Sequence, residues 1–167
     1  VIAVSFVSVP AAGTPVLRDT PQHIDDVARA LAAGTGPIAI DTERASAYRY
    51  DDRAFVIQLR RHGSGTFLID PEAEPRATRD MAKVVNEAEW VLHAAHTDLP
   101  CLLALDWHPQ VLHDTQIAGQ ILGAERIGLS GMLKAYFDIE VPKDKGNADW
   151  SRRPRCPYPW APQCRSR

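Results

Sequence analysis

The first helical pattern in the chain begins at Thr20-Pro21, a residue that caps helices followed by one that favours their first turn. Apolar residues then recur every three or four positions, which is typical of a helix with one buried face. The glycine- and proline-containing sequence 34–37 would end this helix. Residues 1–19 show no such periodicity, and we expect a loose leader there. The apolar positions are Ile24, Val27, Ala28 and Leu31.

Short apolar runs follow this helix and predict strands. Residues 38–41 form the first run, directly after the glycine turn. Residues 54–59 and 66–70 form two more runs, separated by the hairpin-like sequence 60–65. The first half of the domain is therefore predicted to be one helix followed by a three-stranded antiparallel meander.

After Pro71 the pattern alternates between helix and strand, which is the arrangement expected of parallel crossover units. A meander that continues into such units predicts an α/β domain with a mixed sheet and flanking helices. The predicted helices are 75–88, 98–106 and 115–122, the predicted strands are 90–93 and 111–113, and a last amphipathic helix has Ile127, Leu129, Met132, Leu133, Tyr136 and Phe137 as its apolar positions.

The tail has a different character, because four prolines lie within nine residues and no apolar periodicity remains. We expect residues 155–167 to be irregular and poorly packed. The folded domain is therefore predicted to span residues 20–154. The prolines are Pro154, Pro157, Pro159 and Pro162.

Composition narrows the class of protein without naming a function. A chain of 167 residues with 45% hydrophobic and 24% charged residues is expected to form one globular domain. Its net charge of -2 means that a nucleic acid would be held by a local basic patch or through metal ions. The apolar start is too short for a membrane span, so we expect a cytoplasmic protein. The cysteine spacing predicts neither a zinc site nor a disulfide framework.

Two carboxylates end the first predicted strand with one residue between them. Asp41 and Glu43 should project from the same side, because strand side chains alternate between faces. Asp98 follows the predicted strand 90–93 at the start of the next helix, where Thr97 could act as the cap. If the two strands are neighbours, the three carboxyl groups should converge at one end of the sheet. Mg²⁺ or Mn²⁺ would suit such a set of hard oxygen ligands.

Each of these signals also has a structural interpretation. An Asp-x-Glu pair is often a solvated strand end, and Asp98 alone could be a charge that favours a helix start. His93 is expected to be a hydrogen-bonded structural residue and His96 to be partly exposed. Asp114 is expected to cap a helix, with a supporting role behind the metal ligands as the alternative. The residues of the 44–53 segment could stack bases and grip phosphates, or could simply form an exposed loop.

The order of these motifs resembles the ribonuclease D branch of the DEDD family of 3′-to-5′ exonucleases, in the subgroup that uses a tyrosine. The sequences 38–43 and 90–99 are similar to the first and second exonuclease motifs of that family. The resemblance covers about residues 20–154 and continues through the strands 54–59 and 67–71, the Asp-Thr segment 113–118, the sequence 128–136, and the segments 143–145 and 149–154.

The resemblance implies an RNase H-like fold and hydrolysis of RNA from single-stranded 3′ ends, with tRNA precursors as an example of a substrate. It implies two Mg²⁺ or Mn²⁺ ions in the complete family site. From the sequence we expect no membrane partner, and no obligate protein partner is evident. Asp41, Glu43 and Asp98 would be catalytic metal ligands. Asp114 would support them, and the residues that would contact nucleic acid are Thr42, Arg44, Tyr48, Gln58 and His93.

The sequence departs from the family after Pro154. The family continues with a Tyr-x-x-x-Asp helix that supplies a water-positioning tyrosine and a fourth acid, whereas here Tyr158 is followed four residues later by Pro162. We therefore expect a truncated or frame-shifted domain with impaired hydrolysis. The alternatives are a non-catalytic RNA-binding remnant and a scaffold with no role in nucleic-acid binding.

Overall fold

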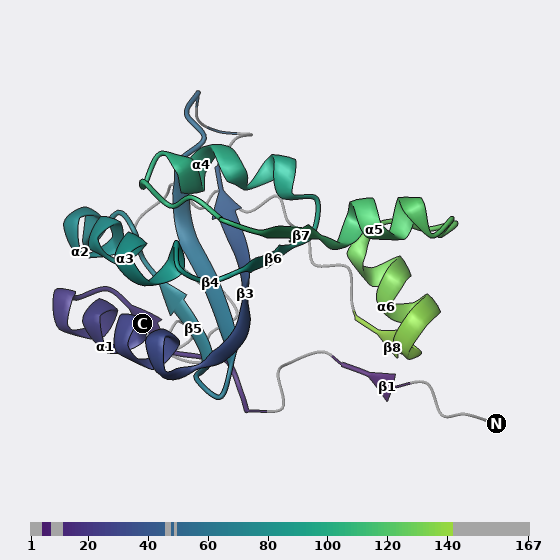
Figure 1. Ribbon diagram of the computed structural model, residues 1–167, viewed down its shortest axis with the longest axis horizontal. Helices are drawn as coiled ribbons and strands as arrows, with labels where there is room; N and C mark the ends of the chain where they lie inside the picture. Colours follow the sequence, from purple (N-terminus) through teal and green to yellow (C-terminus); the bar gives the residue numbers. More distant parts are fainter. Residues whose placement is uncertain (1–4, 8–11, 46–47, 49, 142–167) are drawn as a thin grey trace.

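The computed structural model describes residues 5–7, 12–45, 48 and 50–141 of the chain. A six-stranded mixed sheet forms its centre, in the order β2-β5-β4-β3-β6-β7 (Figure 1). The antiparallel meander β3-β4-β5 and the parallel strands β6 and β7 confirm the predicted α/β class. The strands are β2 (Leu17–Arg18), β3 (Thr35–Arg44), β4 (Ala54–His62), β5 (Gly65–Ile69), β6 (Trp90–Leu92) and β7 (Leu112–Asp114).

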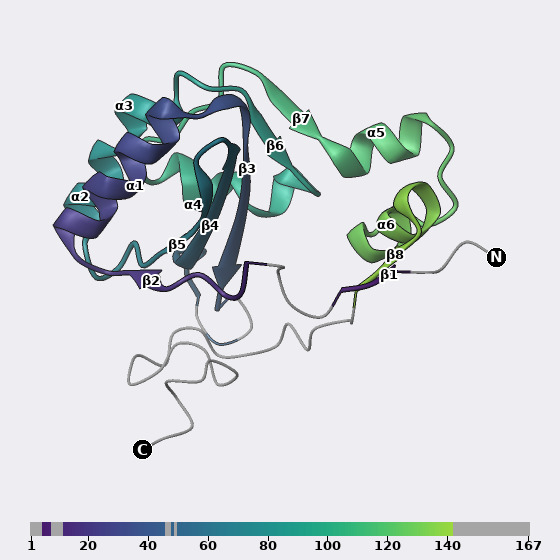
Figure 2. The same cartoon turned by 90° about the horizontal axis from the view of Figure 1, so that it is seen from below.

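The helices of the domain lie in two groups (Figures 1 and 2). Helices α1 to α4 form the first group and contribute to the main core against one face of the sheet, whereas α5 and α6 follow β7 and lie farther from the meander. A two-stranded parallel sheet of β1 (Ser5–Phe6) and β8 (Ile139–Glu140) adjoins α6. The helices are α1 (Pro21–Ala33), α2 (Pro75–Asp80), α3 (Ala82–Val85), the short 3₁₀ helix η1 (Ala95–Thr97), α4 (Leu99–Leu103), α5 (Thr115–Ile121) and α6 (Leu129–Phe137).

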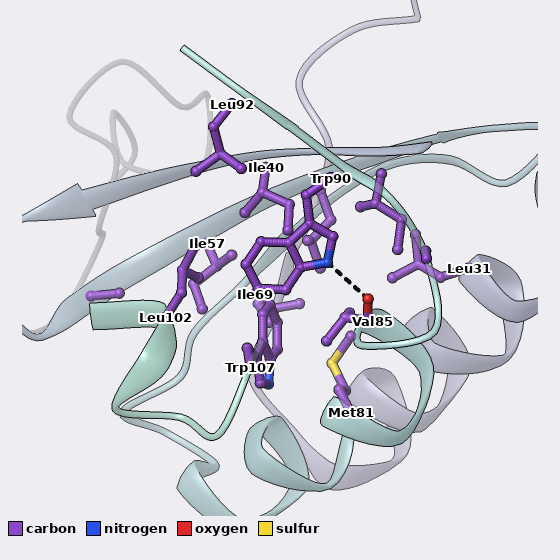
Figure 3. Close-up of a cluster of buried hydrophobic side chains, with 14 of the residues drawn as sticks. Leu31, Ile40, Ile57, Ile69, Met81, Val85, Trp90, Leu92, Leu102 and Trp107 are labelled. Atoms are coloured by element: carbon purple, nitrogen blue, oxygen red, sulfur yellow. Dashed lines mark hydrogen bonds between the residues drawn. The ribbon is translucent and has the colours of Figure 1, made fainter. Parts of the chain in front are cut away.

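The main core lies between the sheet and the first group of helices (Figure 3). Along β3, Ile38 and Ile40 are buried in this core, whereas Ala39 and Asp41 are exposed. This period-two pattern fixes which residues of β3 face the helices and which face away. Trp90 and Trp107 are fully buried, and the indole Nε1 of Trp90 donates to the carbonyl of Val85 at 2.8 Å.

Helix α1 begins where the sequence predicts. The Thr20 hydroxyl accepts a hydrogen bond from the backbone N–H of His23 at 3.3 Å, and Pro21 is the first helical residue. The helix ends at Gly34, where a Cβ atom would lie 2.9 Å from the carbonyl oxygen of His62. Glycine therefore lets the end of α1 approach β4 closely.

Several element boundaries differ from the predicted ones for identifiable reasons. The predicted helix 75–88 is divided at Met81 and ends at Val85. The side chain of the following Asn86 instead bonds the backbone of Asp106 and His108. The predicted helix 98–106 ends at Leu103, and Asp106 has a φ of 61°.

The predictions for the two ends of the chain can be compared with the structure only at the N-terminal end. The expected leader 1–19 contains the short strands β1 and β2, and β2 pairs with β5 in parallel. The predicted irregular tail 155–167 lies outside the described residues, as does the sequence from residue 142. Among the described residues, no helix is long and apolar enough to cross a membrane.

Candidate active site

Asp41 and Glu43 lie on the same face of β3, as their spacing predicts. Strand β4 pairs Gln58 directly with Asp41, so the Gln58 side chain lies on that face too. Its Nε2 donates to Oδ2 of Asp41 at 2.9 Å and to Oε1 of Glu43 at 3.3 Å. One amide group therefore links the two carboxylates.

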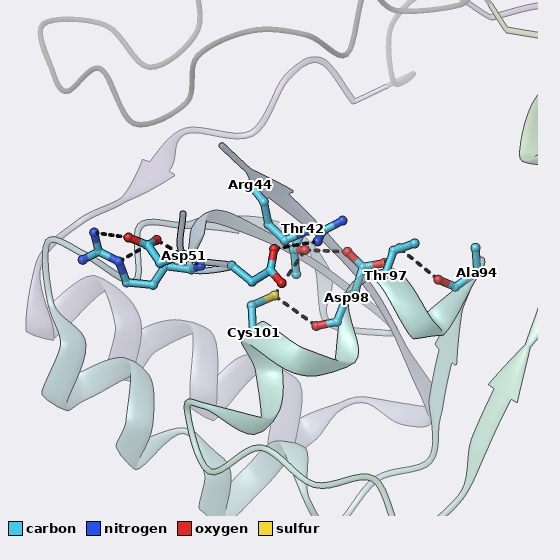
Figure 4. Close-up of polar contacts among 9 residues, drawn as sticks. Thr42, Arg44, Asp51, Ala94, Thr97, Asp98 and Cys101 are labelled. Carbon is cyan, nitrogen blue, oxygen red and sulfur yellow. Dashed lines mark hydrogen bonds and ion pairs between the residues drawn. The ribbon is translucent and has the colours of Figure 1, made fainter. Parts of the chain in front are cut away.

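Asp98 is buried at the start of α4, with an exposed fraction of 5%. Its Oδ1 accepts a 2.5 Å hydrogen bond from the hydroxyl of Thr42, and its Oδ2 lies 3.0 Å from the hydroxyl of Thr97 (Figure 4). Thr42 stands between Asp41 and Glu43 in the sequence, and its buried side chain alternates to the face opposite theirs. The Thr42 hydroxyl gives a partner to a carboxylate that would be costly to bury without one.

The electrostatics of Asp41 connect it with Asp98. The pKa of Asp41 is raised to about 6, first because the surrounding protein removes water from its carboxylate and second because Asp98 is negatively charged. A backbone hydrogen bond from Thr42 and the positive charge of Arg44 act in the opposite direction. Asp41 thus has the perturbed pKa that often marks a functional carboxylate.

The arrangement fits one cation better than a closed three-acid site. Asp41 and Glu43 offer hard oxygen ligands on one face, and a hydrated Mg²⁺ commonly uses only one or two carboxylates. Residues 5–7, 12–45, 48 and 50–141 contain no group of three His, Cys, Asp or Glu side chains that could hold a metal ion. Asp41 and Glu43 lie together beside Gln58. The charge of Asp98 acts on Asp41, whereas the Asp98 carboxylate itself is bonded to Thr42.

Two arginines at the end of β3 and in the described part of the following loop are paired with carboxylates. Arg44 is partly buried, and its guanidinium lies 3.4 Å from Asp52. Arg53 pairs with Asp51 and Glu72 and lies over the Phe55 ring, 5.8 Å from its centroid. Tyr48, however, is 51% exposed and could stack on a base.

His93 has the structural hydrogen bond that we expected. Nδ1 lies 2.9 Å from the Thr115 hydroxyl, which itself donates to the carbonyl of Leu92. Nε2 is buried and has no hydrogen-bond partner among the described residues. His96 is exposed.

Asp114 is the N-cap of α5, as predicted. Its carboxylate accepts from the backbone N–H groups of Gln116 and Ile117, and also from those of Ala94 and Ala95. Burial alone would raise the pKa of Asp114, but the four backbone hydrogen bonds together lower it. Asp114 therefore ties the start of α5 to the loop that leads from β6 to Asp98.

Replacing Asp114 with alanine is expected to lower the free energy of unfolding by about 2 kcal/mol at pH 7, because a cap and two further hydrogen bonds are lost. The folded state lowers the pKa of this carboxyl, so its contribution is complete above the usual pKa near 3.8 and disappears as the pH falls through the folded value. Urea denaturation at pH 7 and at pH 3 tests both points. Asp25→Ala, on the exposed side of α1, is the control; an equal loss at both pH values would contradict the prediction.

Two contacts around Asp98 were not predicted from the sequence. Cys101, which we would place in the core, directs its Sγ to the carbonyl of Asp98 at 3.0 Å and to the Thr42 hydroxyl at 3.5 Å. Burial raises the pKa of this thiol, with the negative charge of Asp98 as a smaller cause. Thr97 does not cap α4; its hydroxyl lies near the Ala94 carbonyl and Asp98 instead. The only sequence signal was the spacing of three between Asp98 and Cys101.

Comparisons with known proteins place the sequence in a family. A family model described as 3′-5′ exonuclease matches residues 15–160. Ribonuclease D of Pseudomonas paraeruginosa is 35% identical over 121 residues, which cover 70% of this chain and 32% of that protein. The chain thus spans about a third of the length of this curated relative.

Solved structures show the same architecture. A protein from Bifidobacterium adolescentis is 35% identical with a TM-score of 0.86, and the match covers 92% of this chain and 38% of that one. Escherichia coli RNase D, described as an exoribonuclease involved in structured RNA processing, is 26% identical with a TM-score of 0.63. That match covers 85% of this chain and 38% of RNase D.

Proposed function

Because the chain belongs to the 3′-5′ exonuclease family and is related to ribonuclease D, we propose that it removes nucleotides from the 3′ ends of RNA. The resemblance seen in the sequence is thereby confirmed, together with an RNase H-like fold. The substrate we propose is a single-stranded 3′ end on a structured RNA, such as a tRNA precursor.

The observation that supports this proposal best is the Asp41-Glu43 pair. The two carboxylates lie on one face, share the Gln58 amide, and are near enough to Asp98 for its charge to raise the pKa of Asp41. Such a pair would hold Mg²⁺ or Mn²⁺, which in this family activates water and stabilises the leaving 3′ oxygen. The exposed Tyr48 is suited to stack on a terminal base.

We propose further that hydrolysis by this chain is slow. The carboxylate of Asp98 is bonded to Thr42 and lies outside the pair, so a second ion would be weakly held. Tyr158 is followed by Pro162 at the position where the family has its fourth acid. Loss of a positioned group of this kind costs about 10²–10⁴-fold in rate. If hydrolysis were lost altogether, the chain would be a non-catalytic RNA-binding domain.

A 3′-labelled RNA incubated with the chain and Mg²⁺ or Mn²⁺ tests the proposal. We expect slow release of labelled mononucleotide that stops when the metal is chelated, and faster release by a chimera in which a Tyr-x-x-x-Asp helix follows Pro154. A matched 5′-labelled RNA should shorten stepwise. Binding of the RNA at low salt without release would identify the non-catalytic alternative, and release that is insensitive to chelation would contradict the proposed chemistry.

A further inference from the structure

The side chain of Gln58 bridges the carboxylates of Asp41 and Glu43. It lies opposite Asp41 in the β3-β4 pair, and its single Nε2 reaches both Asp41 at 2.9 Å and Glu43 at 3.3 Å. A side-chain amide nitrogen carries two hydrogens, so it can donate to both carboxylates at once.

The chemical type of this donor is informative. Two neighbouring carboxylates repel each other, and a bridging donor reduces that cost. A lysine or arginine in this place would also cancel the negative charge that attracts a cation, whereas an amide is neutral. Arg60, two residues along β4 and so on the same face, is exposed and donates to Thr66 at 2.7 Å instead.

We propose that Gln58 is a positioning residue, which holds the Asp41 and Glu43 carboxylates side by side and so prepares them for a divalent cation. This inference rests on the proposed function, because it assigns Gln58 a role in that same site. Groups that orient metal ligands typically change metal affinity by about 10–100-fold when they are removed. The role is distinct from contact with RNA, which was the expectation for Gln58 from the family resemblance.

Calorimetric titration of the whole chain with Mn²⁺, without RNA, tests the proposal. Gln58→Met keeps the length of the side chain but cannot donate, and we expect Mn²⁺ affinity to fall about tenfold. Gln22→Met is the matched control, because Gln22 also donates to a carboxylate, that of Asp26 at 3.2 Å, but lies on the exposed side of α1. Unchanged Mn²⁺ affinity in Gln58→Met would overturn the proposal.

A second variant separates positioning from simple structural support. Gln58→Lys supplies a charged donor to both carboxylates, so we expect the chain to remain at least as stable as the wild type at pH 8. Its Mn²⁺ affinity should nevertheless fall by more than about tenfold, because the ammonium competes with the cation. If the Mn²⁺ affinities of the two variants merely followed their urea denaturation midpoints, Gln58 would have only a structural role and the proposal would be wrong.

The same variants distinguish this proposal from the proposed function. If the wild-type chain releases no nucleotide but Gln58→Met still weakens Mn²⁺ binding, the positioning role stands and the exonuclease activity does not. If the wild-type chain releases nucleotides but Gln58→Met binds Mn²⁺ normally, the activity stands and the positioning role is wrong. Failure of the wild-type chain to bind Mn²⁺ would overturn the positioning role directly.

Discussion

Replacement of Asp41 with asparagine is expected to abolish metal-dependent release of nucleotides from a 3′-labelled RNA. The change keeps the shape of the side chain but removes the charge of one of the two carboxylates that share Gln58. We expect a fall of about 10²–10⁴-fold in the rate, which should take slow hydrolysis below detection. Release is measured under single-turnover conditions with Mn²⁺. The control is Asp25→Asn, because Asp25 lies on the exposed side of α1. Retention of the wild-type rate would exclude the pair as the active site.

The Asp41→Asn variant should be more stable than the wild type at neutral pH. A measured rise in its stability would show that the variant loses activity without losing its fold. The surrounding protein, which removes water from the carboxylate, and then the charge of Asp98 raise the pKa of Asp41 to about 6 from the usual 3.8. The folded state therefore binds this proton more tightly than the unfolded state, and the wild type loses stability as the pH rises from about 4 to 6. Asparagine does not ionise. Urea midpoints should thus favour Asp41→Asn at pH 8 and agree with the wild type near pH 3.5.

The largest expected effect on stability is that of Trp90→Ala, about 3–5 kcal/mol. Trp90 is fully buried, and it is paired with Ile38 of β3 on one side and with Leu112 of β7 on the other. Truncation leaves a cavity and also removes the hydrogen bond to the Val85 carbonyl. A loss of this size is a large part of the 5–15 kcal/mol that stabilises a typical domain.

Urea denaturation at pH 7, followed by circular dichroism, measures this loss. Trp90→Phe is the matched variant, because it keeps an aromatic ring in the core but has no N–H group for Val85. Trp90→Phe should lower the free energy of unfolding by clearly less than Trp90→Ala. If Trp90→Ala lost no more than about 1 kcal/mol, the packing around Trp90 would be looser than the structure shows.

The parts of the site that depend on local geometry could be predicted from the sequence. Asp41 and Glu43 share a face because strand side chains alternate. The helix cap at Asp114 also follows from its immediate neighbours. These features require no knowledge of distant residues.

The features that were missed depend on contacts between distant residues. The direction of the Asp98 side chain is set by the hydroxyl of Thr42, 56 positions earlier in the chain. The end of α3 is followed by bonds from Asn86 to residues about 20 positions later. The strands β1 and β2 have only two residues each, which is too short for a hydrophobic pattern to emerge.

The alternation along β3 also determines where the gene can tolerate a change in length. The pairing of residues 35–38 with β4 is already irregular. A one-codon insertion or deletion there could therefore change this irregularity without shifting the rest of β3 relative to β4. Between Ile38 and Asp41 the pairing is regular, and loss of one codon would turn every later side chain to the other face. Asp41 would then take the buried position of Ile40, Glu43 would take the position of Thr42 beside Asp98, and Thr42 would lie opposite Gln58. The short segment 38–41 is therefore intolerant of length variation, whatever residues occupy it.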